Sequence, residues 1–162
     1  MRQKMAVSFG LAFSTAAGIA LAACAPASSP APTTLSNDPA AVHERALTLD
    51  THLDTPLHFN RPGWSFAEEH SFAQDLSHVD LPRMRRGGLD GGFFVVYTPQ
   101  GPLTGDGYAA AARHALGRLD SVHRVTTQNA QHMALATSAQ DARRTATTGK
   151  RIAFIRLEQS LP

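Results

Sequence analysis

Cysteine is almost absent from this sequence. Cys24 is the only one among 162 residues, so no disulfide can form within the chain. No serine or cysteine stands in a pattern typical of nucleophilic catalysis. The glycine pairs Gly87-Gly88 and Gly91-Gly92 lie too close together for a phosphate-binding loop, and we interpret them as turns. These absences direct attention to histidine and carboxylate chemistry.

An excess of one charge is also missing, once the first residues are set aside. The chain has 15 Lys and Arg against 13 Asp and Glu. Arg2 and Lys4 lie in an N-terminal leader, and without them the two charges balance. The sequence contains no basic stripe with interleaved aromatic residues, so we expect no nucleic-acid partner.

The N-terminus has the layout of a targeting segment. Residues 1–23 combine basic Arg2 and Lys4 with an apolar run of small residues, which is typical of a secretory signal peptide. The run ends Leu21-Ala22-Ala23-Cys24 and resembles a bacterial lipobox, in which the thiol of Cys24 receives the lipid. The alternative is an ordinary signal peptide or membrane anchor with an incidental cysteine.

The residues after Cys24 predict a tether. Residues 24–37 are rich in Pro, Ala, Ser and Thr and contain no charge, so they cannot build a core. We therefore expect a lipid-anchored protein of the cell envelope that faces the periplasm. Ala25, rather than an aspartate, favours the outer membrane.

From residue 38 onward the pattern predicts a folded domain. Helical signals, either N-cap patterns or apolar residues every three or four positions, mark residues 38–46, 81–86, 106–132 and 138–148. Strand signals, which are runs of apolar residues, mark residues 47–51, 91–97 and 151–158. Strands that alternate with helices predict an α/β fold with a parallel sheet.

The most informative motif follows the first predicted strand. His52 and Asp54 are two residues apart, and side chains at this spacing share a face of a strand. An imidazole nitrogen and a carboxylate oxygen are suitable ligands for a zinc-like metal. Strand ends carry the catalytic groups of barrels built from alternating strands and helices. The motif favours a metallohydrolase, and the alternative is a histidine bonded to a carboxylate without metal.

The other histidines are weaker candidates. Three are spaced nine residues apart along a predicted helix: His114, His123 and His132. Because each residue turns a helix by about 100°, these three do not share a face. Three others lie in polar loop sequence near the motif: His58, His70 and His78. We interpret them as surface or structural residues, although any of them could face the site.

Several segments together resemble the membrane (renal) dipeptidase family. The resemblance covers roughly residues 40–158 and is carried by residues 49–54, 79–88, 91–97 and 151–158. It implies a (β/α)₈ barrel with two zinc ions at the carboxyl ends of its strands, and hydrolysis of dipeptides, often with a D-residue in the second position. By this resemblance, His52 and Asp54 bind one zinc, and Glu158 bridges both.

The resemblance is incomplete. The family's usual Asp-Gly-His-Asn-Asp reads Asp50-Thr51-His52-Leu53-Asp54 in this chain, which keeps the ligand positions. The turn that usually follows the bridging glutamate in the family is replaced after Glu158. The family's two later zinc-binding histidines, substrate-binding arginine and late aspartate have no counterpart. The residues from Ala40 onward are about half the roughly 250 of a complete barrel. We therefore expect the N-terminal part of a dipeptidase barrel, with about three strands, that is poorly stable and inactive as an isolated chain.

Two alternatives differ in function. One is a non-catalytic envelope lipoprotein that binds metal or peptide through a partial site. The other is a different amidohydrolase-like metalloenzyme, but those barrels more often open with His-x-His, and Asp54 speaks against this.

Overall fold

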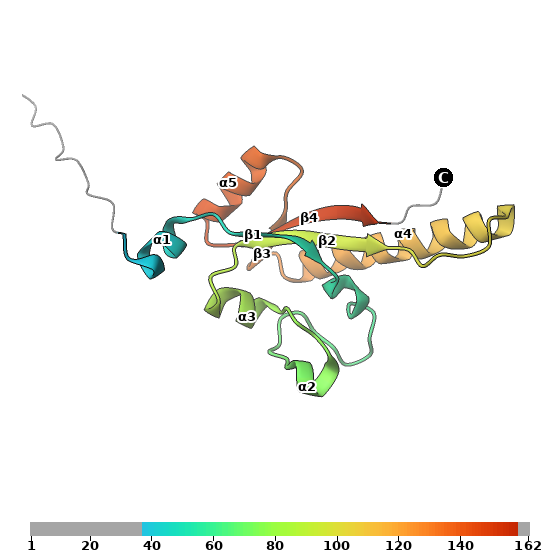
Figure 1. Cartoon of the computed structure of the whole chain (residues 1–162), viewed down its shortest axis with the longest axis horizontal. Coiled ribbons are helices and arrows are strands. Elements are labelled where there is room, and N and C mark those ends of the chain that lie inside the picture. Colours follow the sequence, from blue (N-terminus) through green and yellow to red (C-terminus); the bar gives the residue numbers. More distant parts are fainter. Residues whose placement is uncertain (1–36, 159–162) are drawn as a thin grey trace, which may run out of the picture. The chain divides into compact units, whose positions relative to one another are not determined.

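The computed structural model describes residues 37–158 (Figure 1). The predicted signal peptide, Cys24 and nearly all of the tether lie outside the described residues, as do residues 159–162. No helix within residues 37–158 is both long enough and apolar enough to cross a membrane.

Four parallel strands form one sheet in the order β1-β2-β4-β3. Their bounds are β1 Leu49–Leu53, β2 Gly91–Tyr97, β3 Met133–Leu135 and β4 Arg151–Glu158. The helices are α1 Pro39–Arg45, η1 Thr55–Leu57, α2 Phe72–Asp75, α3 Leu81–Arg86, α4 Gly105–Gln128 and α5 Ala139–Thr147. This arrangement confirms the predicted α/β fold with a parallel sheet.

Side-chain caps start α1, α3, α4 and α5. The Asp38 carboxylate accepts a hydrogen bond from the Ala41 N–H, and the Asp80 carboxylate accepts one from Arg83. The hydroxyls of Thr104 and Ser138 do the same for α4 and α5. Each cap satisfies a backbone N–H that the helix itself leaves unpaired.

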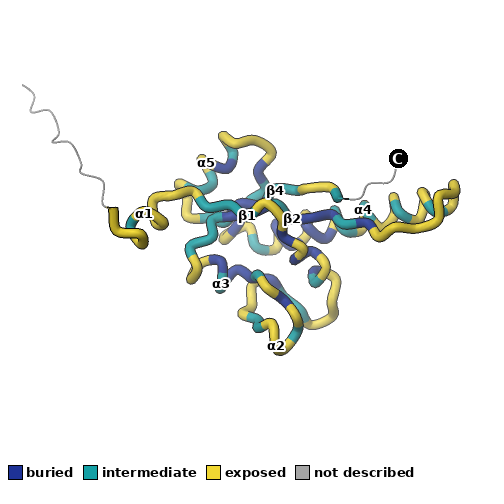
Figure 2. Tube along the Cα trace, viewed as in Figure 1, coloured by how far each residue is buried: buried dark blue, intermediate teal, exposed yellow. Residues whose placement is uncertain are grey.

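Apolar residues pack against both faces of the sheet. Neighbouring strand residues point in opposite directions, so Ile152 and Ala153 lie on different faces. Ala153 packs with Phe94 and with Val122 and Val125 of α4, in the larger of two apolar clusters. Ile152, next to Ala153, packs instead with Ala142 of α5. Figure 2 shows the buried residues concentrated in the central strands and in the part of α4 beside them.

The structure corrects three details of the sequence prediction. β1 begins at Leu49 rather than residue 47, and its pairing with β2 is irregular between Asp50 and Leu53. α4 ends at Gln128, where the Asn129 side chain and backbone both donate to the Val125 carbonyl, so residues 129–132 are not helical. The short strand β3 was not predicted, which makes four strands rather than three.

The second glycine pair is not a turn. Gly91 and Gly92 are the first residues of β2, where neighbouring backbone comes too close for a side chain. A Cβ on Gly91 would clash with the Ile152 carbonyl, and one on Gly92 would lie 2.9 Å from the Asp50 carbonyl. Glycine is needed here to let the three long strands approach one another.

Candidate metal centre

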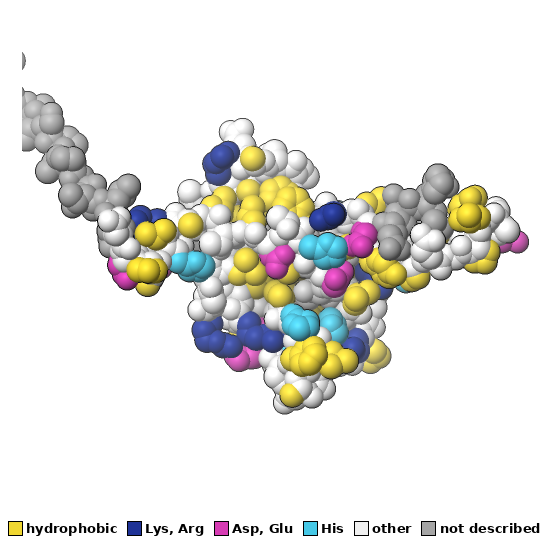
Figure 3. Space-filling model, in the orientation of Figure 1, with side chains coloured by type: hydrophobic (Ala, Val, Ile, Leu, Met, Phe, Trp, Pro, Cys, Tyr) yellow, Lys and Arg dark blue, Asp and Glu magenta, His cyan; other side chains and the backbone are white. Residues whose placement is uncertain are grey.

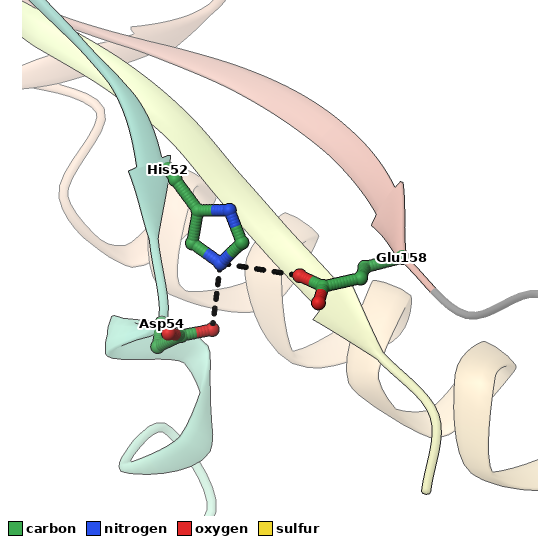
Figure 4. Close-up of side chains that lie close together, drawn as sticks. All are labelled: His52, Asp54 and Glu158. Carbon is green, nitrogen blue, oxygen red and sulfur yellow. Dashed lines mark ion pairs between the residues drawn. The ribbon is translucent and has the colours of Figure 1, made fainter. Parts of the chain in front are cut away.

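Three potential ligands converge at the carboxyl ends of the two strands that flank β2 (Figure 4). His52 lies in β1, Asp54 follows it as the N-cap residue of η1, and Glu158 is the last residue of β4. The His52 Nε2 lies 3.4 Å from Asp54 Oδ1 and 3.1 Å from Glu158 Oε2. One ligand atom from each residue falls within 4.8 Å of the other two.

The backbone around these residues is held from several sides. The Asp50 carboxylate accepts a hydrogen bond from the His52 N–H at 2.8 Å, within the irregular part of β1. Arg156 of β4 donates to the Thr51 carbonyl at 3.2 Å, and Arg118 of α4 donates to the Pro56 carbonyl at 2.5 Å. These bonds fix the chain on both sides of the His52–Asp54 pair.

The three side chains suit a divalent metal. Glu158 Oε2 is buried and accepts no hydrogen bond from any residue within 37–158, although His52 Nε2 is nearby. Nε2 carries at most one hydrogen, which cannot satisfy both carboxylates. A cation among the three atoms would satisfy all of them, and one nitrogen with two carboxylate oxygens is a donor set that zinc accepts.

The site is open on one side. The side chains of His52, Asp54 and Glu158 are 38%, 56% and 30% exposed. Three protein ligands with an accessible fourth position are typical of catalytic rather than structural zinc. In Figure 3, histidine and carboxylate side chains gather on the face that carries these strand ends.

A cavity of about 280 Å³ adjoins two of the three ligands, His52 and Asp54. His52 and Asp54 lie in its wall, as do His58 and His78. Two of the three loop histidines therefore face the site. The pKa of His58 is lowered, chiefly by burial and next by the charge of Arg61, so its imidazole is neutral at pH 7.

His70, by contrast, has a structural role. Its Nδ1 lies 2.7 Å from the Asp75 carboxylate, and its ring stacks on Trp64 at a centroid distance of 4.6 Å. Trp64 also stacks with His58, at 5.4 Å, and donates its indole N–H to Asp75. A hydrogen bond from Ser77, helped by those of the backbone and Trp64 and by His70, lowers the pKa of Asp75 to about 2. The stack thus links His58 to a carboxylate that is ionised at neutral pH.

The remaining histidines lie outside the ligand group. His114, His123 and His132 are exposed, as expected from their spacing, and none joins the three ligands. The apolar residues beside the site, Leu57 and Leu76, were not identified from the sequence. No periodic pattern marks them, because they lie in a short 3₁₀ helix and a turn.

A sequence model of one family, the membrane dipeptidases (peptidase family M19), matches residues 37–161. The chain belongs to the membrane dipeptidase family. The resemblance inferred from the sequence is thereby confirmed, and with it membership of a family of metallopeptidases. A search of curated proteins found no match.

Solved structures agree in fold. The probable dipeptidase PvdM from Pseudomonas aeruginosa is 23% identical, with a TM-score of 0.61 over 72% of this chain and 29% of its own. Dipeptidase AC, a metallopeptidase of family M19, is 23% identical, with a TM-score of 0.55 over 68% of this chain and 34% of its own. A Rhodobacter sphaeroides metallopeptidase liganded with a phosphinate mimic of the dipeptide L-Ala-D-Ala is 21% identical, with a TM-score of 0.55 over 68% of this chain and 37% of its own.

This chain therefore spans about a third of the length of these solved structures. The parallel sheet corresponds to part of a larger barrel, which confirms the predicted incomplete (β/α)₈ fold. The assignment of His52, Asp54 and Glu158 as metal ligands stays a prediction, supported by their convergence.

Proposed function

We propose that this chain carries the first zinc-binding part of a dipeptidase active site, and that the complete site hydrolyses dipeptides. The observation behind this proposal is the convergence of His52, Asp54 and Glu158 at strand ends, in a member of a family of metallodipeptidases. The dipeptide-mimic ligand of the Rhodobacter sphaeroides metallopeptidase supports the same substrate class.

Each ligand residue has a distinct task in this proposal. His52 offers a nitrogen lone pair from Nε2, so it binds in its neutral form and a protonated ring must first lose its proton. Asp54 and Glu158 supply negative charge, and Glu158 has a second oxygen that could contact another ion. Zinc, when bound, supplies the Lewis acidity that activates water and polarises a peptide carbonyl.

The three converging residues are enough for one zinc but not for two. A zinc ion takes about four ligands, so a second ion bridged by Glu158 needs donors beyond those grouped within residues 37–158. We therefore propose that this chain alone binds zinc but does not turn over dipeptides.

The test is to purify residues 25–162, titrate zinc, and assay hydrolysis of several dipeptides with and without the metal. Zinc binding without turnover is the expected result. Measurable zinc-dependent hydrolysis would contradict the proposed inactivity, and failure to bind zinc would contradict the proposed site. Peptide binding that needs no zinc but that His52→Ala abolishes would instead favour a non-catalytic binding lipoprotein.

We further propose that Cys24 carries a lipid that anchors the chain to the outer membrane, facing the periplasm. The motif around Cys24 and the uncharged tether after it support this proposal. In a bacterial host, Cys24→Ser is expected to abolish membrane partitioning and the mass increase due to the lipid. Unchanged partitioning and mass would contradict the anchor.

A further inference from the structure

The cavity beside His52 and Asp54 has an apolar wall. Four of the residues that line it are aliphatic: Leu53, Leu57, Leu76 and Val79. Leu53 is buried in the core, but Leu57 and Leu76 remain 50% and 63% exposed. In Figure 3, hydrophobic and histidine side chains lie next to one another on this face of the molecule. Two large apolar side chains are thus kept in contact with solvent beside the candidate metal centre.

Leu76 also has an unusual backbone. It ends α2 with φ of +63° and ψ of +17°, the left-handed region, and is the only non-glycine residue with positive φ within residues 37–158. Glycine or asparagine is usual at this position of a helix end, because a side chain there is strained. Strained residues of this kind cluster at functional sites, where the surrounding structure holds them in place.

The turn does not depend on the leucine side chain. The Leu76 N–H donates to the Phe72 carbonyl, and the neighbouring Asp75 carboxylate accepts hydrogen bonds from Trp64 and the Ser77 N–H. Packing in the core does not explain the residue either, since most of its surface is exposed. What its position does achieve is to bring an apolar side chain to the cavity that contains His52 and Asp54.

We propose that Leu57 and Leu76 form a specificity pocket for an apolar side chain of the dipeptide. This inference rests on the proposed function, because it places a substrate at the three ligands. The cavity of about 280 Å³ is large enough for one side chain, and the proposed ligands His52 and Asp54 lie in its wall. Asp50 also lines it, whereas no Lys or Arg does, so an acidic side chain is disfavoured.

The experiment uses the full chain loaded with zinc, and measures binding of leucylglycine, glycylleucine and glycylglycine by NMR titration. Leu76→Gly and Leu76→Asn relieve the backbone strain and remove the apolar contact. Both variants are expected to keep or raise Tm, to keep zinc affinity, and to lose about tenfold in affinity for at least one leucine-containing dipeptide. Binding of glycylglycine should not change.

Two further variants guard against an effect on folding. Leu57→Ala should cause a similar loss, whereas Leu103→Ala, an exposed leucine that does not line this cavity, should cause none. Equal binding of the three dipeptides to wild type, or unchanged affinities in Leu57 and Leu76 variants that still bind zinc, would overturn the pocket. Absence of zinc binding in wild type would overturn the proposed function and the pocket together.

Discussion

The Nε2 of His52 lies 3.1 Å from Oε2 of Glu158, although β2 separates the strands that carry them. The ends of β1 and β4 are not level, because Leu53 and Ile155 both pair with Phe94, whereas Glu158 pairs with Tyr97, three residues further along β2. The side chains of His52 and Glu158 span this offset, where the pairing of β1 with β2 is irregular. The geometry of the candidate metal centre therefore depends on the irregular end of β1 as well as on how β2 and β4 pair.

Replacing Glu158 should separate metal binding from folding. Glu158→Gln keeps the shape of the side chain but removes its charge, so we expect zinc affinity to fall by about 100-fold or more. The Tm of the metal-free protein should not fall, because two carboxylates no longer compete for one imidazole. Competition with a chromophoric chelator measures the affinity. The control is Glu44→Gln, an exposed residue of α1; a similar loss there would refute the assignment.

Arg118 should stabilise the segment that follows Asp54. Its side chain donates to the Pro56 carbonyl, and burial lowers its pKa. Arg118→Ala would leave the carbonyl of buried Pro56 with its backbone hydrogen bonds alone, at a cost of about 0.5–1.5 kcal/mol in the free energy of unfolding, and should also weaken zinc binding. Arg113→Ala, an exposed residue of the same helix, is the matched control for urea unfolding. Equal effects of the two substitutions would show that the Pro56 contact is unimportant.

Because the pKa of Asp75 is low in the folded protein, the free energy of unfolding should decrease at acidic pH. Its pKa falls from 3.8 to about 2 in the folded protein, so the folded state favours the ionised carboxylate. This contribution is fully present above about pH 4 and is lost as the pH falls towards 2. Asp75→Asn should flatten the dependence of unfolding free energy on pH in this window. Parallel pH profiles for variant and wild type would contradict the role of the Trp64–His70–Asp75 cluster.

Two glycines should respond oppositely to alanine. Gly91→Ala places a Cβ against the Ile152 carbonyl inside the sheet, and such overpacking costs about 1–3 kcal/mol. Gly117 lies in α4 with open space around its Cβ position, so Gly117→Ala should stabilise the protein by about 0.5–1 kcal/mol. Thermal unfolding of the two variants gives the comparison, and a stable Gly91→Ala protein would contradict the strand spacing described above.

The long apolar strands could be predicted from the sequence, and the short or irregular elements could not. β2 and β4 begin and end at the predicted residues, because short continuous runs of aromatic and β-branched residues such as Phe93–Val96 are typical of buried strands. β3 has three residues and no pattern of its own, and its pairing with β4 determines it. The end of α4 depends on hydrogen bonds from Asn129 that apolar periodicity does not reveal.

The candidate site shows the same division. His52, Asp54 and Glu158 could be selected from spacing and family resemblance, and the structure brings them together. His58 and His70 occupy similar loop sequence, yet one lines the cavity while the other bonds to Asp75. That difference depends on contacts formed only in the folded chain. The left-handed backbone of Leu76 could not be predicted from the sequence, because it depends on where α2 ends.

The most direct test of the zinc site is X-ray absorption at the zinc edge on the full chain, together with metal stoichiometry. We predict one zinc per chain, with one imidazole nitrogen and carboxylate oxygens at about 2.0–2.2 Å. His52→Ala should remove the imidazole signal and most of the bound metal. Zinc that is absent from wild type, or an imidazole signal that persists in His52→Ala, would contradict the account.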